Sequence, residues 1–272
     1  MHSYLRCLSM VSAIVLVMSV AHAGEQGSQT LVAEVLGRSI TLRDLDAGNV
    51  PNEAKAPAID DLTIKRMRQE KLRGLVWTAV LEDYATQRRI EPTPAEIDSN
   101  IRNSRRLGEE LRVKRDKERT SLTQELASPG LSDARRKQAQ QHLDNLNLIQ
   151  EHDAREAKER ADPAREKAWQ EAEQGVAKYS VKSWKINQAL HRDFGGRLIF
   201  QQAGMEPIDA YRKLLEQYEG RKAFVIRDPV FKDAVNSYFQ HSFYYADETK
   251  AQFYFEKPWW ERTAAEMKAA GF

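Results

Sequence analysis

Leu31-Val-Ala-Glu-Val-Leu36 runs into Gly37-Arg38 and then into Ser39-Ile-Thr-Leu-Arg-Asp44. The apolar and β-branched residues of 31–36 predict a short strand. Thr41 and Asp44 have the spacing of a helix-capping box, so a helix is expected to begin near residue 42. No residue of this stretch belongs to a catalytic motif, and we therefore expect it to specify architecture rather than chemistry.

A long apolar helix is expected next, from about Asp60 to Arg89. Leu72, Val76 and Val80 repeat at helical spacing and define its buried face. Thr93-Pro-Ala-Glu96 then combines a capping box with proline at the first helical position. This second start signal predicts a further helix from Pro94.

Residues 102–178 form a charged region that is almost entirely Arg, Lys, Glu, Asp, Gln and Ala, with scattered Leu. Ser128-Pro-Gly130 should end the helix that starts at Pro94, and Ser132 is placed to cap a return helix. The sequence therefore predicts a helical hairpin whose arms are about 50 Å long, with Leu111 roughly opposite Leu148. Acidic residues balance its arginine runs, which favours salt-bridged faces over an anion-binding patch. A solvated spacer and a client-binding, partner-docking or dimer-forming arm remain open alternatives.

Residues 179–272 contain most of the aromatic side chains. Strands are predicted at 197–202 and 223–226, and helices from Pro207 and over 230–241. Because the strand candidates lie far apart in sequence, a small sheet would bring this region back onto the first one. The expected fold is mainly α with a small β-sheet. Residues 24–101 and 179–272 form one helical domain, and residues 102–178 are an inserted hairpin arm.

Residues 1–23 have the pattern of a cleaved signal peptide. Arg6 supplies the positive start, Leu8 to Val20 the apolar run, and Ala21-His-Ala23 the cleavage site. The apolar run falls short of the roughly 20 residues of a spanning helix, which disfavours an uncleaved anchor. No later segment resembles a transmembrane helix. Cys7 is the only cysteine, so the expected mature chain has neither disulfide nor thiol chemistry.

The charge of the expected mature chain is close to zero. Loss of residues 1–23 removes Arg6 and leaves 41 basic against 40 acidic residues. Nucleic-acid binding requires a marked basic excess, so we expect no nucleic-acid partner.

The motifs of common enzymes are missing from the sequence. His142, His152, His191 and His241 do not have the spacing of metal ligands. There is no nucleophile motif, and Gly195-Gly196 lacks the features of a phosphate loop. We therefore expect no enzyme activity, no cofactor and no metal site.

Aromatic residues are the more informative candidates, because they crowd into residues 238–260. They are interpreted either as core or as a surface for unfolded polypeptide, since aromatic rings bind such segments with little sequence demand. Lys257-Pro-Trp-Trp260 is expected to be the exposed part. The candidate peptide-binding residues are Trp77, Tyr84, Trp184, Phe239, Phe243, Tyr244, Trp259 and Trp260.

The N-terminal pattern resembles the chaperone domain of SurA-type periplasmic folding factors. The matching positions are Val32–Leu36, Gly37, Ile40-Thr41, the apolar helix Leu72–Tyr84 and the entry Arg89-Ile-Glu-Pro-Thr-Pro-Ala-Glu-Ile97. In that family a later segment completes the domain, and residues 179–272 could play this part. No parvulin-like stretch follows, so prolyl isomerase activity is not expected. The charged hairpin departs from the family pattern.

The resemblance implies a periplasmic chaperone or assembly factor. Its partners would be unfolded or nascent exported polypeptides, including those of the outer membrane. Two alternatives remain: an interaction subunit with one dedicated periplasmic partner, and an isomerase-related protein. The sequence leaves client identity and homodimer formation undecided.

Overall fold

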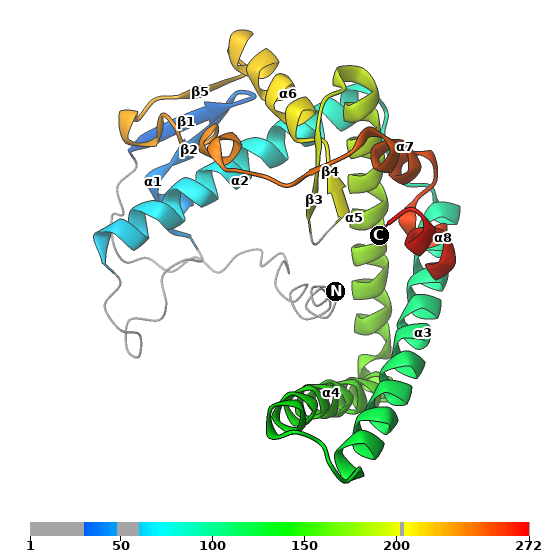
Figure 1. The fold of residues 1–272 in the computed structure, drawn as a ribbon. Helices are drawn as coiled ribbons and strands as arrows, with labels where there is room; N and C mark the ends of the chain where they lie inside the picture. Colours follow the sequence, from blue (N-terminus) through cyan, green and yellow to red (C-terminus); the bar gives the residue numbers. More distant parts are fainter. Residues whose placement is uncertain (1–29, 48–59, 202–203, 272) are drawn as a thin grey trace. The chain divides into compact units, whose positions relative to one another are not determined.

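A computed structural model describes residues 30–47, 60–201 and 204–271. The described chain is mainly helical, as predicted, and it contains two small antiparallel sheets where one was expected (Figure 1). It divides into two compact units. The first comprises residues 1–91 and 183–256, and the second residues 92–182 and 257–272. The expected signal peptide and the loop after residue 47 lie outside the described residues.

The first sheet joins the two sequence segments of the first unit. Its strands are β1 (Leu31–Val35), β2 (Arg38–Thr41) and β5 (Phe224–Ile226), in the order β2-β1-β5. β1 pairs antiparallel with β5, with Ala33 opposite Ile226 and Val35 opposite Phe224 (Figure 1). The predicted return of the last region onto the first strand is therefore confirmed.

β2 was not predicted as a strand. It follows β1 through a turn at Leu36 and Gly37, both of which have positive φ angles, the geometry that tight hairpin turns require. Only Ile40 of β2 is buried, so the strand carries little of the apolar alternation by which strands are recognised.

Four helical segments of the first unit contribute to one apolar core. They are α1 (Leu42–Asp46), α2 (Asp61–Gln87), α6 (Ile208–Gly220) and the final turns of α5 (Pro163–Phe194), and the unit also contains α7 (Glu248–Glu256). The predicted capping box of Thr41 and Asp44 is present at the start of α1. The core draws on the sheet, α2, α5 and α6, and its largest fully buried side chains include Leu45, Leu72, Val76, Val80, Leu190, Leu214 and Tyr218.

The second sheet contains β3 (Leu198–Gln201), β4 (Gly204–Glu206) and β6 (Tyr245–Ala246), in the order β4-β3-β6. Only β3 was predicted, because β4 and β6 have three and two residues and show no periodic pattern. The chain enters β3 beside α6. There Asp209 accepts hydrogen bonds from the backbone N–H and the guanidinium of Arg197, at 2.8 to 3.0 Å.

The prediction of a helix over residues 230–241 is wrong. Two 3-10 turns, η2 (Pro229–Phe231) and η3 (Ser237–Gln240), replace it. Val, Asn, Ser, Tyr and Phe in this stretch have only modest helix propensity, so tertiary contacts can decide the backbone. Phe231, Ala234 and Val235 are buried in the core, and the residues that follow turn toward α2.

The second unit contains α3 (Pro94–Ala127), α4 (Asp133–Arg160), the part of α5 before residue 183, η4 (Trp259–Glu261) and α8 (Ala264–Ala269). The capping box of Thr93 and Glu96 and the cap at Ser132 are present as predicted. α3 and α4 meet through Leu122, Ala139 and Leu146. No helix among the described residues has the length and apolarity needed to cross a membrane.

Leu111 and Leu148 are both exposed, so they are not part of the buried contact between α3 and α4. Leu146 faces α3, and Leu148 lies two residues further on, which places it about 200° around the helix. The predicted seam therefore continues through Leu146 and not through Leu148.

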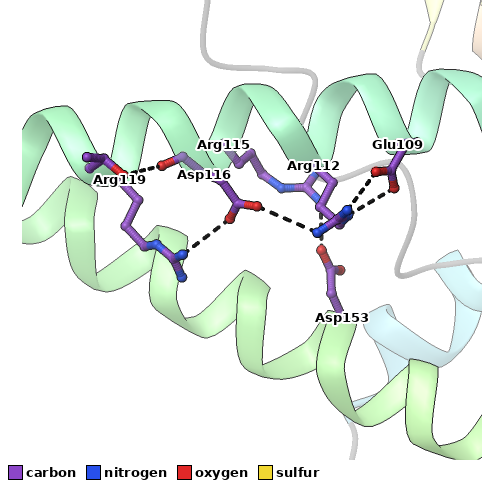
Figure 2. Close-up of polar contacts among 7 residues, drawn as sticks. Glu109, Arg112, Arg115, Asp116, Arg119 and Asp153 are labelled. Carbon is purple, nitrogen blue, oxygen red and sulfur yellow. Dashed lines mark hydrogen bonds and ion pairs between the residues drawn. The ribbon is translucent and has the colours of Figure 1, made fainter.

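Paired charges cover the hairpin. Figure 2 shows Arg112 with Glu109 and Asp116 on α3, while Arg115 reaches Asp153 of α4 at 2.6 Å. The predicted balance of the arginine runs is confirmed. Arg105 pairs with Glu173, Arg106 with Glu110, and Arg135 with Glu125.

The compact units differ from the predicted division in their boundaries. Residues 92–101, 179–182 and 257–271 were expected in the same body as the first strand, but they group with the charged helices. Ser99 Oγ of α3 donates to Glu261 Oε1 at 3.0 Å, and η4 packs on α3. The C-terminal residues thus serve as packing for the start of α3.

Gly196 is expected to be the more sensitive of two adjacent glycines. Its φ angle is +96°, and an added Cβ would lie 2.5 Å from Cβ of Asp209, whereas Gly195 has φ +61° and open space around it. Gly196→Ala should lower the unfolding free energy by about 2 kcal/mol, and Gly195→Ala by about 1 kcal/mol. Urea unfolding measures both, and equal losses would contradict the close approach to Asp209.

Candidate functional site

A stack of aromatic rings lies on α2 of the first unit. The ring of Trp77 stacks with Tyr211 of α6 at 5.5 Å between centroids and with Phe239 at 5.4 Å. Tyr238 meets Trp77 edge-on at 5.2 Å and contacts Phe243 at 5.3 Å. These five residues are called the aromatic cluster below. They bring together three segments that are far apart in sequence.

The position of Trp77 follows from the periodicity of α2. Val76 and Val80 are fully buried, and Trp77, one residue beyond Val76, lies at the margin of the core, where it is half-buried. The side chain of Tyr211 is held in place, because its hydroxyl donates to Oδ1 of Asn187 at 2.6 Å. The Trp77–Tyr211 pair is therefore a supported platform at the edge of the core.

The indole N–H of Trp77 is buried, and within the described residues no acceptor lies in hydrogen-bonding range of it. A buried donor without an acceptor costs about 1–3 kcal/mol. Trp77 thus combines a large apolar face with an unused donor. A polypeptide offers the complementary groups, namely apolar side chains and backbone carbonyl oxygens.

Polar groups surround Tyr238. The guanidinium of Arg73 lies 5.4 Å from its ring centroid, and Nε2 of Gln201 donates to its hydroxyl at 3.2 Å. Burial raises the pKa of the Glu206 carboxyl, and a hydrogen bond from Tyr238 only partly opposes this. Burial and the charge of Glu206 in turn raise the pKa of Tyr238.

The aromatic surface continues into solvent beyond Phe243. Tyr244 is 98% exposed, and Tyr245 is exposed with the guanidinium of Arg197 4.1 Å from its ring centroid. Three successive aromatic residues, of which Phe243 is half-buried and Tyr244 and Tyr245 are exposed, are unusual on an inert surface. The site therefore extends from the edge of the core to open solvent.

Of the eight predicted site residues, the structure brings Trp77, Phe239 and Phe243 together, with Tyr244 beside them in sequence. Tyr84 is 3% exposed, and its hydroxyl donates to Asp193 at 2.6 Å, so it belongs to the core. Nε1 of Trp184 donates to the carbonyl of Tyr254 at 3.3 Å. Trp184 thus helps to hold α7 against α5.

Trp259 and Trp260 belong to the second unit, and the predicted exposure of Lys257–Trp260 is wrong for Trp260. Trp260 is 2% exposed and Trp259 is half-buried. The expectation rested on Pro258 breaking the preceding helix. Pro258 does so, but it leads into η4, which packs on α3.

Sequence reasoning did not select Tyr211, Tyr238, Arg73 or Glu206. Tyr211 and Tyr238 fall within the helices predicted from Pro207 and over residues 230–241, and the second of these helices does not form. Arg73 is four residues before Trp77, the spacing that places two side chains on one helix face. Its position near Trp77 could therefore have been predicted from the sequence.

Two other places are poorer candidates. A hollow of about 340 Å³ between α3 and α4 is lined by Arg112, Arg115 and Arg119, but acidic partners pair all three. His191 is half-buried against Phe255, and burial lowers its pKa. Over the described ranges, no group of three or more His, Cys, Asp and Glu side chains could hold a metal ion.

Comparisons with protein-family models, curated proteins and solved structures found no match. The likeness to SurA-type chaperone domains therefore stays a prediction from the sequence pattern.

The stability of the first unit should fall as pH rises through the titration of Glu206. Its folded-state pKa is raised, so the protonated carboxyl favours folding below the unfolded value of about 4.5, and this contribution is lost as pH rises through the folded pKa. Glu206→Gln should match the wild type near pH 4 and be more stable near pH 8, as measured by urea unfolding. A difference between the two that does not change with pH would contradict this assignment.

Asp209 provides a control, because its contribution to stability should depend on pH in the opposite direction. The Arg197 side chain and backbone N–H lower its pKa to about 2 from 3.8. Asp209→Asn should therefore lose stability at neutral pH, and its difference from the wild type should vanish as pH falls toward about 2. An unchanged difference at acid pH would show that Asn fails for steric reasons instead.

Proposed function

We propose that this chain is a non-enzymatic polypeptide-binding protein, a chaperone or assembly factor that is exported to the periplasm. The observation that carries the proposal is the aromatic cluster, in which a supported Trp77–Tyr211 platform carries a buried indole N–H with no acceptor among the described residues. The clients would be unfolded or nascent exported polypeptides.

The chemistry of the site fits such clients. Aromatic rings offer large contact areas with few rotatable bonds, and they accept apolar side chains of many shapes. An indole N–H can donate a hydrogen bond to any backbone carbonyl oxygen, so it adds affinity without requiring a particular sequence. Binding of this kind requires no nucleotide or metal.

The proposal includes a more specific assignment of the fold. We infer that the first unit is a SurA-like chaperone domain and that the charged hairpin is an insertion into it. One support is the order of elements, which is a strand, a capped helix, a long apolar helix and a helix that starts at Pro94. The other is the pairing of β1 with β5. The export signal of residues 1–23 supports the periplasmic compartment.

A second candidate is an interaction subunit that binds one dedicated partner through the hairpin. The observation in its favour is the set of large apolar side chains that the helices of the second unit expose, which are Leu111, Val113, Leu148, Val176 and Tyr179. A pull-down separates the two functions, since many unrelated clients favour the chaperone and one stoichiometric partner favours the subunit.

The first test is client binding by the full chain without residues 1–23. At a near-equimolar ratio it should suppress the aggregation of an unfolded outer-membrane-type protein, measured by light scattering. The proposed function would be rejected if the protein neither suppressed this aggregation nor bound a fluorescent unfolded peptide.

The second test locates the binding surface with a pair of tryptophan variants. Trp77→Leu removes the platform and its N–H, and should weaken peptide binding about tenfold in fluorescence anisotropy. Trp169→Leu is the matched control, because Trp169 lies in the second unit, where Arg160 covers its ring. Circular dichroism and urea unfolding verify that both variants fold. Equal affinities for both variants would move the site away from Trp77.

A further inference from the structure

The Trp77 platform is occupied by the chain itself. Phe239 stacks on the indole, and Tyr238 meets it edge-on. Both residues come from η3, a single 3-10 turn in a stretch without α-helix or strand. Residues 236–243, which contain this turn, are called the cover segment.

The cover segment is held mainly by its side chains. Its backbone hydrogen bonds in the described structure are local, from Ser237 to Asp233, from Phe239 to Asn236 and from His241 to Tyr238. Val235, before the segment, is buried in the core, and Tyr245, after it, pairs with Ile199 of β3. The segment is therefore a loop tied at both ends, and few backbone bonds would break if its middle moved away.

The segment is also an imperfect occupant of the platform. It covers the indole of Trp77 but supplies no acceptor to its N–H. Tyr238 places its hydroxyl beside Glu206, whose charge burial disfavours. A polypeptide that offered both an aromatic ring and a carbonyl oxygen would satisfy Trp77 better than the cover segment does.

We propose that the cover segment is displaceable, and that an aromatic side chain of a bound polypeptide takes the place of Phe239 on the Trp77 ring. This inference rests on the proposed polypeptide binding and adds its regulation. The apparent affinity for a client is then reduced by the fraction of molecules in which the platform is uncovered. Changes that loosen the cover segment therefore tighten client binding.

Affinity for a fluorescent unfolded peptide rich in Phe and Tyr tests this in three variants of the full chain without residues 1–23. Phe239→Ala should bind about fivefold more tightly than the wild type, because it removes the ring that competes for Trp77. Tyr238→Phe keeps the ring and loses the hydrogen bond from Gln201, so it should tighten binding by a smaller factor while preserving the fold. Phe243→Ala is the matched control, since that ring contacts Tyr238, His241 and Tyr245; it should change affinity less than Phe239→Ala.

Hydrogen exchange of the wild type completes the test. Peptide binding should accelerate the exchange of residues 236–243 and slow that of the helix around Trp77. If Phe239→Ala or Tyr238→Phe weakens binding, or if the peptide slows exchange in residues 236–243, these residues are part of the binding surface and the cover is rejected. The proposed function then still stands. If neither the wild type nor any variant binds peptide, the proposed function fails together with the inference that rests on it.

Discussion

The antiparallel pairing of β1 with β5 is the interaction on which the first unit depends. Ala33 and Val35 of β1 face Ile226 and Phe224 across nearly two hundred residues of sequence. Backbone N–H groups of Leu36 and Arg227 extend the pairing at its two ends. With this closure, α2 and α6 share one core, and Trp77 can meet Tyr211 and Phe239. A pairing of such separation is entropically expensive, so it must be supported by the apolar residues that it buries.

The long helices were predictable because their signals are local. Capping boxes at Thr41 and Thr93, the cap at Ser132 and the helix start at Pro94 all act within four residues, and all are present. The pairing of β1 with β5 was also predictable, because few strand candidates existed. β2, β4 and β6 were not, since strands this short are selected by their partners and not by their own sequences.

The candidate site was predicted only in part, for a related reason. The crowding of aromatics in residues 238–260 pointed to the right region, but burial could not be assigned residue by residue. Trp260 became core because a 3-10 turn directs it onto α3, whereas Tyr244 is left in solvent. The expected helix over 230–241 gave way to turns that place Tyr238 and Phe239 against Trp77. Tertiary stacking decided both outcomes, and no local signal encodes it.

The central claim is that a polypeptide binds at the Trp77 platform of the first unit. Hydrogen exchange of the full chain with a saturating unfolded outer-membrane-type peptide tests it most directly. The account predicts that exchange slows in residues 71–81 and 207–218, which carry Trp77 and Tyr211. Changes confined to residues 92–182 and 257–272 would contradict it and place the binding surface in the second unit.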